Sequence, residues 1–235
     1  MVKRAFSLVE LLVVVAVMAL LISMLLPVLS GARQAGRQAV CSANLRSVLL
    51  AVQLYLQESG DWLPAAEPPL REFPDTRHWF MNAALMRQMA IDIPLDQEGV
   101  PAGPPKAGSV LVCPSHTRPE RWRDGTELPY ALSYGVNGTW GLGGRPDHME
   151  LRRLIEFTHP SNVLAFTDAC GIAVAPGIVL YQGCPRDNFD FRHRERANVA
   201  WLDGHVTPVV EDDIPFGMKN RYEVFWSSKE PQLAK

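Results

Sequence analysis

The sequence predicts an α+β protein in which a long N-terminal helix packs on a small antiparallel β-sheet head. Two observations predict this class. The first is an apolar run over residues 11–29, followed by helix-compatible sequence as far as residue 57. The second is a remainder in which short apolar segments alternate with turns rich in proline and glycine, a pattern typical of strands.

The size and charge of the chain narrow its class. The 235 residues suffice for one membrane helix and one modest globular domain. The net charge is -2, and no Lys/Arg-rich patch is interleaved with aromatic residues, so we expect no binding to nucleic acid. We expect a leader over residues 1–5, a helix over 6–58 and an α+β head over 59–235.

The predicted N-terminal helix divides into two parts. Only Ser23 and Pro27 interrupt the apolar run, which is long enough to span a bilayer at about residues 8–29. Pro27 predicts a kink, because proline lacks the N–H that the helix needs. Beyond it the helix becomes amphipathic, and its apolar stripe must be covered by another part of the chain. The stripe consists of Val40, Leu45, Val48, Leu49, Val52 and Leu56.

The head is expected to contain one short helix, one helical turn and several strands. Residues 78–91 predict the helix and residues 152–157 the helical turn. The segments that predict strands are 110–112, 130–136, 162–167 and 177–182. Asn137-Gly138 is a turn signal, and residues 222–226 are expected to dock back on the head.

The strongest hairpin signal lies near the C-terminus. Apolar-rich segments at 198–202 and 205–210 flank Asp203-Gly204. This pair favours a two-residue type I′ turn, which needs positive φ at both central residues. Pro208 cannot donate a hydrogen bond to a neighbouring strand, so the second segment is expected at the edge of the sheet.

Two simpler interpretations of residues 1–30 remain open at this point. The segment has the features of a removable secretory signal ending at Ser30-Gly31-Ala32, and also those of a plain single-span anchor. Neither interpretation explains Glu10, an acid at the start of the apolar run. A carboxylate inside a bilayer is costly and indicates a function that supplies a partner.

The segment KRAFSLVELL (residues 3–12) resembles the signal of type IV prepilins and type II secretion pseudopilins. The resemblance implies cleavage between Ala5 and Phe6, methylation of the new amino group of Phe6, and a role for Glu10 in assembly. Pro27 would stand where helices of this family commonly carry their proline. Ala5 departs from the family pattern, which usually has glycine there.

A second resemblance covers the C-terminal half. His193, nine residues and then Asp203-Gly204 resemble the C-terminal His-x9-Asp-Gly hallmark of a large family of bacterial prepilin-like proteins. The structural interpretation is that His193 bonds the turn or the Asp203 carboxylate. A calcium site is the second interpretation. Its main candidate ligands are Asp187, Asp190 and Asp203, and further oxygen donors are Asp168, Asn188 and the acidic residues 211–213. A catalytic or zinc site of His193, Asp203 and His205 is the third.

Four cysteines allow three disulfide pairings. Cys170 and Cys184 enclose a segment that can fold as a hairpin and bring them together. That pairing leaves Cys41, on the helix, and Cys113, in the head, to tie helix to sheet. The alternative is four reduced, buried thiols.

These observations predict a structural subunit, not an enzyme, of a type IV pilus-like or type II secretion filament. Its expected partners are the inner membrane, a prepilin peptidase, other subunits and the assembly platform, with no cofactor other than the candidate calcium. Lys3 and Arg4 favour a cytoplasmic N-terminus, which puts the head in the periplasm. The alternative is a single-span anchored domain that binds a ligand through tryptophans 79, 122 and 140 and does not polymerise.

Overall fold

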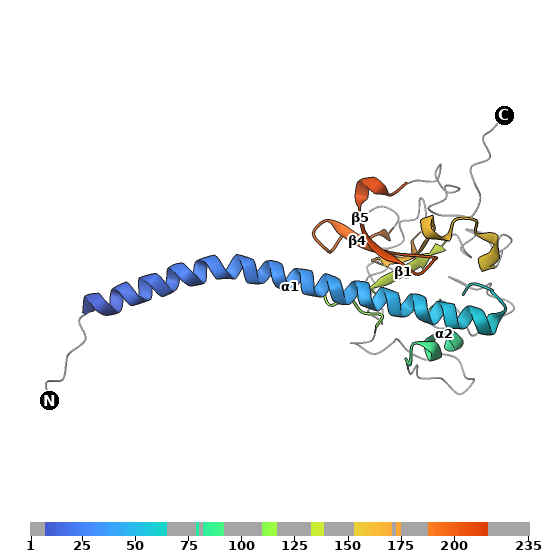
Figure 1. Cartoon of the computed structure of the whole chain (residues 1–235), viewed down its shortest axis with the longest axis horizontal. Coiled ribbons are helices and arrows are strands. Elements are labelled where there is room, and N and C mark those ends of the chain that lie inside the picture. Colours follow the sequence, from blue (N-terminus) through green and yellow to red (C-terminus); the bar gives the residue numbers. More distant parts are fainter. Residues whose placement is uncertain are drawn as a thin grey trace, which may run out of the picture.

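The computed structural model describes residues 8–64, 79, 82–91, 110–116, 133–138, 153–170, 173–174 and 188–215. Helix α1 (Leu8–Ser59) extends far beyond the head, which packs against its C-terminal half (Figure 1). The short helices are α2 (Ala83–Gln88), η3 (Leu154–Glu156), η4 (Pro160–Asn162) and η6 (Glu211–Asp213). The strands are β1 (Tyr134–Asn137), β2 (Leu164–Asp168), β3 (Ala173–Val174), β4 (Arg196–Trp201) and β5 (Val206–Val210). The predicted α+β class is confirmed.

Helix α1 is continuous over its 52 residues. Pro27 lies inside it without breaking it, and the exposed part of the helix curves (Figure 1). The helix ends where expected, because Gly60 adopts a left-handed φ of 68° and the N–H of Asp61 bonds back to the carbonyl of Leu56. Residues 6 and 7 of the predicted helix lie outside the described residues.

The sheet has five strands in the order β3-β1-β2-β4-β5. Neighbours from β1 to β5 pair antiparallel, as predicted, and β3 adds one short parallel pairing to β1. Strand β5 is an edge strand, which agrees with the expectation from Pro208.

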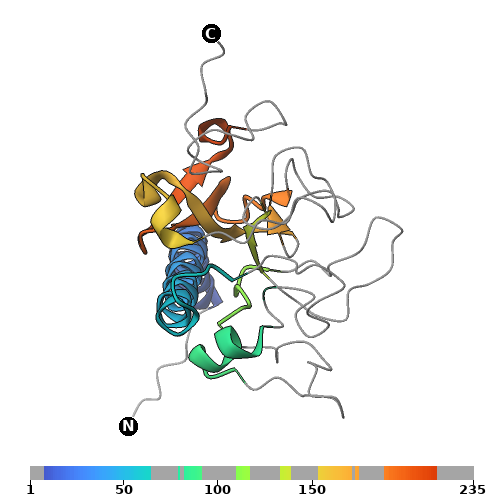
Figure 2. The same cartoon turned by 90° about the vertical axis from the view of Figure 1, so that its right-hand side faces the viewer.

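Helix α1 lies between the sheet and α2, so that the head has three layers (Figures 1 and 2). The predicted stripe, except for the exposed Val40, is buried against the sheet and α2. On β2 the consecutive residues Ala165 and Phe166 both belong to this core, because the strand register shifts between Leu164 and Phe166. A second, smaller cluster around Phe189 covers the opposite face of the sheet.

Two predicted elements are shorter than expected or absent. Helix α2 occupies only part of 78–91. It begins after Asn82, whose side-chain oxygen accepts a hydrogen bond from the N–H of Leu85, and it ends before Ala90, whose φ of 52° is not helical. Residues 110–112 form a turn and not a strand, although the carbonyl of Leu111 accepts a hydrogen bond from Ser133.

The predicted turn at Asn137-Gly138 is wrong at Asn137. This residue belongs to β1, where its buried side chain donates to the carbonyl of Leu164 at 2.8 Å. The helical turn predicted at 152–157 is confirmed as η3, and the strand predicted at 162–167 as β2. The segments predicted at 177–182 and 222–226 lie outside the described residues.

The C-terminal hairpin is confirmed, but its turn differs from the prediction. Trp201 and His205 are hydrogen-bonded across a three-residue loop, and Gly204 alone in this loop has positive φ, at 105°. Such a loop is a turn followed by a left-handed glycine, not a type I′ turn. Positive φ at two consecutive central residues occurs instead at Arg194 and Glu195, at 54° and 62°, where His193 and Arg196 exchange two backbone hydrogen bonds.

Burial of the stripe predicts a large loss on truncation. Leu45→Ala should lower the free energy of unfolding by about 2–5 kcal/mol, because it leaves a cavity under the sheet. Leu50→Ala is the matched control on the exposed side of α1 and should change it by less than about 0.5 kcal/mol. Urea denaturation of the full chain in detergent checks both. Equal losses in the two variants would contradict the packing described.

Candidate functional site

The N-terminal half of α1 presents an almost entirely apolar surface to its surroundings. Leu8 is 79% exposed and Val28 is 69% exposed, and no residue in the most apolar window of the helix is buried. Within the described residues, α1 is the one helix whose length and composition suit a membrane span. Contiguous apolar surface of this extent must be covered by lipid or by other helices.

Glu10 lies in the first turn of α1, within this apolar surface. A carboxylate in the first turn interacts favourably with the positive end of the helix dipole. Ala5 and Phe6, the predicted cleavage site, lie outside the described residues.

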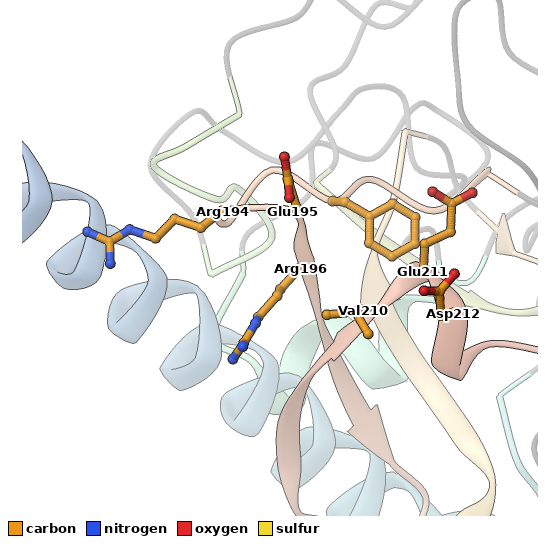
Figure 3. A pocket seen from close by; sticks show the side chains of 7 residues that line it. Arg194, Glu195, Arg196, Val210, Glu211 and Asp212 are labelled. Atoms are coloured by element: carbon orange, nitrogen blue, oxygen red, sulfur yellow. The ribbon is translucent and has the colours of Figure 1, made fainter.

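The head is attached to α1 by the turn that precedes β4. The guanidinium of Arg194 donates to the carbonyl of Gly31 at 3.0 Å and to the side-chain oxygen of Gln34 at 3.2 Å. Figure 3 shows this side chain extended toward the helix, whereas Glu195 points away from it. The left-handed backbone of Arg194 and Glu195 costs about 1–2 kcal/mol per residue. The hydrogen bonds to α1 offset part of that cost.

Further contacts continue along β4. The hydroxyl of Ser42 donates to the side-chain oxygen of Asn198 at 3.1 Å. At the far end of the strand, a Cβ on Gly204 would lie only 3.0 Å from the side-chain nitrogen of Gln53. A side chain here would have to displace the end of Gln53, and the φ of 105° itself disfavours residues other than glycine.

These contacts follow one another in the same order along the two elements. The turn before β4 contacts α1 near residues 31 and 34, the middle of β4 contacts it at residue 42, and the loop after β4 approaches it at residue 53. Strand β4 therefore runs alongside α1 in the same direction. The ten-residue spacing of the His-x9-Asp-Gly motif spans this strand.

A buried polar cluster lies where the beginning of β4 meets α1. Its covalent link is the disulfide between Cys41 and Cys113, which confirms the pairing predicted for these cysteines. The side-chain nitrogen Nε2 of His193 lies 3.4 Å from Cys113 Sγ and 3.5 Å from Asp168 Oδ2. Cys170 is buried just beyond the end of β2, and Cys184 lies outside the described residues.

Asp168 organises this cluster. Its Oδ2 accepts two hydrogen bonds from Asn198, one from the backbone N–H at 2.7 Å and one from the side-chain amide at 2.9 Å. The side chains of Asp168 and His193 are almost completely inaccessible to solvent. Among the described residues, Asp168 Oδ1 has no hydrogen-bond partner.

The structure corrects the predicted contact between His193 and Asp203. Asp203 instead accepts a hydrogen bond from the backbone of His205 and pairs with its ring. His193 and Asp203 lie at opposite ends of β4, so the predicted site of His193, Asp203 and His205 is not assembled.

The predicted calcium ligands are also not brought together. Asp190 pairs with Arg192 at 3.1 Å, Asp203 pairs with His205, and Asp187 lies outside the described residues. Within the described part of the chain, one group of His, Cys, Asp and Glu side chains is close enough to share an ion, namely Cys41, Cys113, Asp168 and His193.

A groove of about 670 Å³ opens beside the turn at 194–195 (Figure 3). Its lining combines two arginines with three carboxylates and a small apolar floor. The residues are Phe191, Arg194, Glu195, Arg196, Val210, Glu211 and Asp212. Its charges are mixed, so it does not favour a ligand of one sign.

The sequence did not predict that Arg194 and Asn198 contact α1. It also did not predict that Asp168 pairs with Asn198 and His193. Asp168 was considered only as an oxygen donor for calcium. The signal that marks it is its place at the end of the buried strand β2, where a charged residue needs a specific partner.

Comparison with known proteins bears on the N-terminal segment. Residues 1–26 match the family model described as the prokaryotic N-terminal methylation motif. These 26 residues are similar to a prepilin signal. Together with the exposed apolar helix that follows it, the motif supports anchoring of the chain in a membrane. No curated protein and no solved structure shows significant similarity to it. The resemblance of its C-terminal motif stays a prediction.

The close approach of Gly204 to α1 predicts opposite effects at two glycines. Gly204→Ala should lower the free energy of unfolding by about 1–2 kcal/mol, because alanine is strained at this φ and meets Gln53. Gly36→Ala should raise it by about 0.5–1 kcal/mol, since open space surrounds this helical glycine. Chemical denaturation of both variants checks the pair, and a stabilised Gly204→Ala would contradict the contact.

Tyr134 makes stability depend on alkaline pH. Burial, and secondarily the Asp168 carboxylate, raise the pKa of the Tyr134 phenol well above its ordinary value of 10.0. The unfolded chain therefore loses this proton first, and stability that is complete below pH 10 falls as the pH rises. The slope approaches about 1.4 kcal/mol per pH unit.

This contribution is measured by comparing the free energies of unfolding of the wild type and Tyr134→Phe at about pH 9 and about pH 11, roughly one unit either side of the ordinary tyrosine pKa. The variant should lose less stability over this interval. Parallel curves would show that Tyr134 titrates normally in the folded head.

Proposed function

We propose that the chain is a structural subunit of a type IV pilus-like or type II secretion filament, polymerised through the N-terminal half of α1. The observation that carries this proposal is the continuity of the methylation motif with the N-terminal half of α1, whose apolar side chains are exposed. In the membrane this surface faces lipid, and in a filament it faces the same helix of other subunits. The proposed role is structural and not catalytic.

Removal of the leader is proposed to prepare the helix for its transfer from lipid into the filament. The proposed cut separates Ala5 from Phe6, and the same enzyme methylates the amino group of Phe6. The methylated amine keeps its positive charge at the end of an apolar helix.

Glu10 supplies the opposite charge in the proposed assembly. A single charge at the centre of a bilayer costs about 2.5–3.5 kcal/mol on insertion scales. Pairing the Glu10 carboxylate of one subunit with the Phe6 amine of its neighbour lowers this cost for both groups. The pairing therefore favours the assembled state over separate subunits in the membrane.

The proposed orientation puts the N-terminus in the cytoplasm and the head in the periplasm. Lys3 and Arg4 precede the span, in agreement with the excess of basic residues on cytoplasmic flanks. The disulfide between Cys41 and Cys113 supports the same orientation, because disulfides persist in oxidising compartments.

A structural role agrees with the burial of the polar groups in the head. His193 and Asp168 are closed off from solvent by the sheet and α1, where no substrate reaches them. Trp79 is fully buried and packs edge-on against Phe166, with the ring centroids 5.0 Å apart. It therefore belongs to the core and not to a binding surface. Trp122 and Trp140 lie outside the described residues.

Co-expression with a prepilin peptidase and its assembly platform tests the proposal. Wild-type chains should begin at methylated Phe6 by intact mass and should form filaments visible by electron microscopy. Glu10→Gln should leave chains anchored and folded but abolish filaments, since the amine of the neighbouring subunit loses its partner. Glu58→Gln, an acid at the head end of the same helix, is the matched control and should assemble normally.

Three results would reject the proposal. A chain that starts after Ala32 would be an ordinary secreted domain, and an uncut Met1 would be a plain anchor. Filaments of undiminished number from Glu10→Gln would show that Glu10 has no part in assembly.

A further inference from the structure

The buried cluster at the junction of α1 and the sheet has the composition of a zinc site. It holds two cysteines, one histidine and one aspartate, and their ligand atoms all lie within 4.8 Å of one another. Thiolate, imidazole and carboxylate are the groups that bind Zn²⁺ in proteins, almost always with tetrahedral geometry in structural sites. We propose that the reduced chain binds one Zn²⁺ through Cys41, Cys113, His193 and Asp168.

Two distances in the cluster already suit this geometry. Bonds of about 2.0–2.3 Å to a tetrahedral zinc put neighbouring ligand atoms about 3.3–3.8 Å apart. His193 Nε2 lies 3.4 Å from Cys113 Sγ and 3.5 Å from Asp168 Oδ2. The same ring nitrogen faces both groups, so the arrangement differs from a catalytic triad, in which histidine uses its two nitrogens for the nucleophile and the acid.

A second, independent observation is the unsatisfied oxygen of Asp168. The carboxylate is completely buried, and among the described residues its Oδ1 accepts no hydrogen bond. Leaving a buried charged acceptor without a partner is costly. A cation bound by the carboxylate neutralises this buried charge, while the two hydrogen bonds from Asn198 to Oδ2 fix the orientation of the carboxylate.

The surroundings also favour thiolate ligands. The backbone N–H of Ser115 points at Cys113 Sγ at 3.4 Å, and such donors stabilise a metal-bound sulfur. Two thiolates, one carboxylate and Zn²⁺ carry a net charge of -1, the same as a site of three cysteines and one histidine.

Disulfide and zinc exclude each other in this site. A dithiol reductant transfers two electrons and two protons to the sulfur–sulfur bond, which breaks to give two thiols while the reductant becomes a disulfide. Zn²⁺ then forms two zinc–sulfur bonds and releases the two thiol protons. Helix α1 is thus joined to the segment that carries Cys113 by the disulfide in the oxidised chain, and to this segment and the sheet through the metal in the reduced chain.

Titration of the reduced full chain in detergent with Co²⁺ tests the proposal. We expect one Co²⁺ per chain, with thiolate charge-transfer and tetrahedral ligand-field absorption, and displacement of Co²⁺ by Zn²⁺. The oxidised chain should show neither band. His193→Gln and Asp168→Asn should each weaken binding at least tenfold, a conservative bound for loss of one ligand. His205→Gln, which alters the exposed His205–Asp203 pair, is the matched control and should bind as the wild type does.

Absorption bands that are absent from the reduced wild type, or equally strong in His193→Gln and Asp168→Asn, would overturn the proposal. X-ray absorption of the zinc-loaded wild type decides the matter without relying on the folding of any variant. Two sulfur and two nitrogen or oxygen ligands are expected. A shell without sulfur would overturn the assignment.

Discussion

The structure depends on the attachment of the C-terminal half of α1 to the sheet. A helix of 52 residues is stable only where its apolar surface is covered, and the chain covers just one half of it. Strand β4 and the turns beside it contact the helix near residues 34, 42 and 53, and α2 packs on the opposite side of the helix. The apolar side chains of the N-terminal half stay exposed, and the proposed function depends on this difference between the two halves of α1.

The two ends of the motif make separate contacts. His193 lies beside the disulfide that joins Cys113 to α1, and Gly204 approaches α1 at Gln53. The strand between them brings Asn198 to Asp168, so that backbone pairing and the polar cluster support the same register.

Much of the fold could be predicted from the sequence because its signals are local. The apolar run, the stripe that follows it and the Asp-Gly hairpin each occupy a few consecutive turns or strands. The type of turn could not be predicted, since Asp203-Gly204 suits more than one loop length and the pairing of Trp201 with His205 selects the longer one. The strand expected at residues 110–112 gave way to a turn that carries Cys113 to the helix.

The candidate site was less accessible to sequence reasoning because it is assembled from four separate segments. Cys41, Cys113, Asp168 and His193 are separated by tens of residues, and no spacing rule connects them. Pairing Cys41 with Cys113 could be inferred because the other two cysteines enclose a short segment. The partner of His193 could not, since an aspartate at the end of β2 reaches it only through the pairing of β2 with β4.

The disulfide also determines how the chain carries a mechanical load. Cys41 and Cys113 are separated by 72 residues in the sequence but joined directly in the structure. A pulling force applied through the N-terminal helix passes from residue 41 to residue 113 along covalent bonds. Residues 42–112 then form a closed loop outside the line of tension, so α2 and the end of α1 cannot be unravelled by a pull from the membrane side. A chain of this design keeps the part of its core within this loop unstressed while its anchor is stretched.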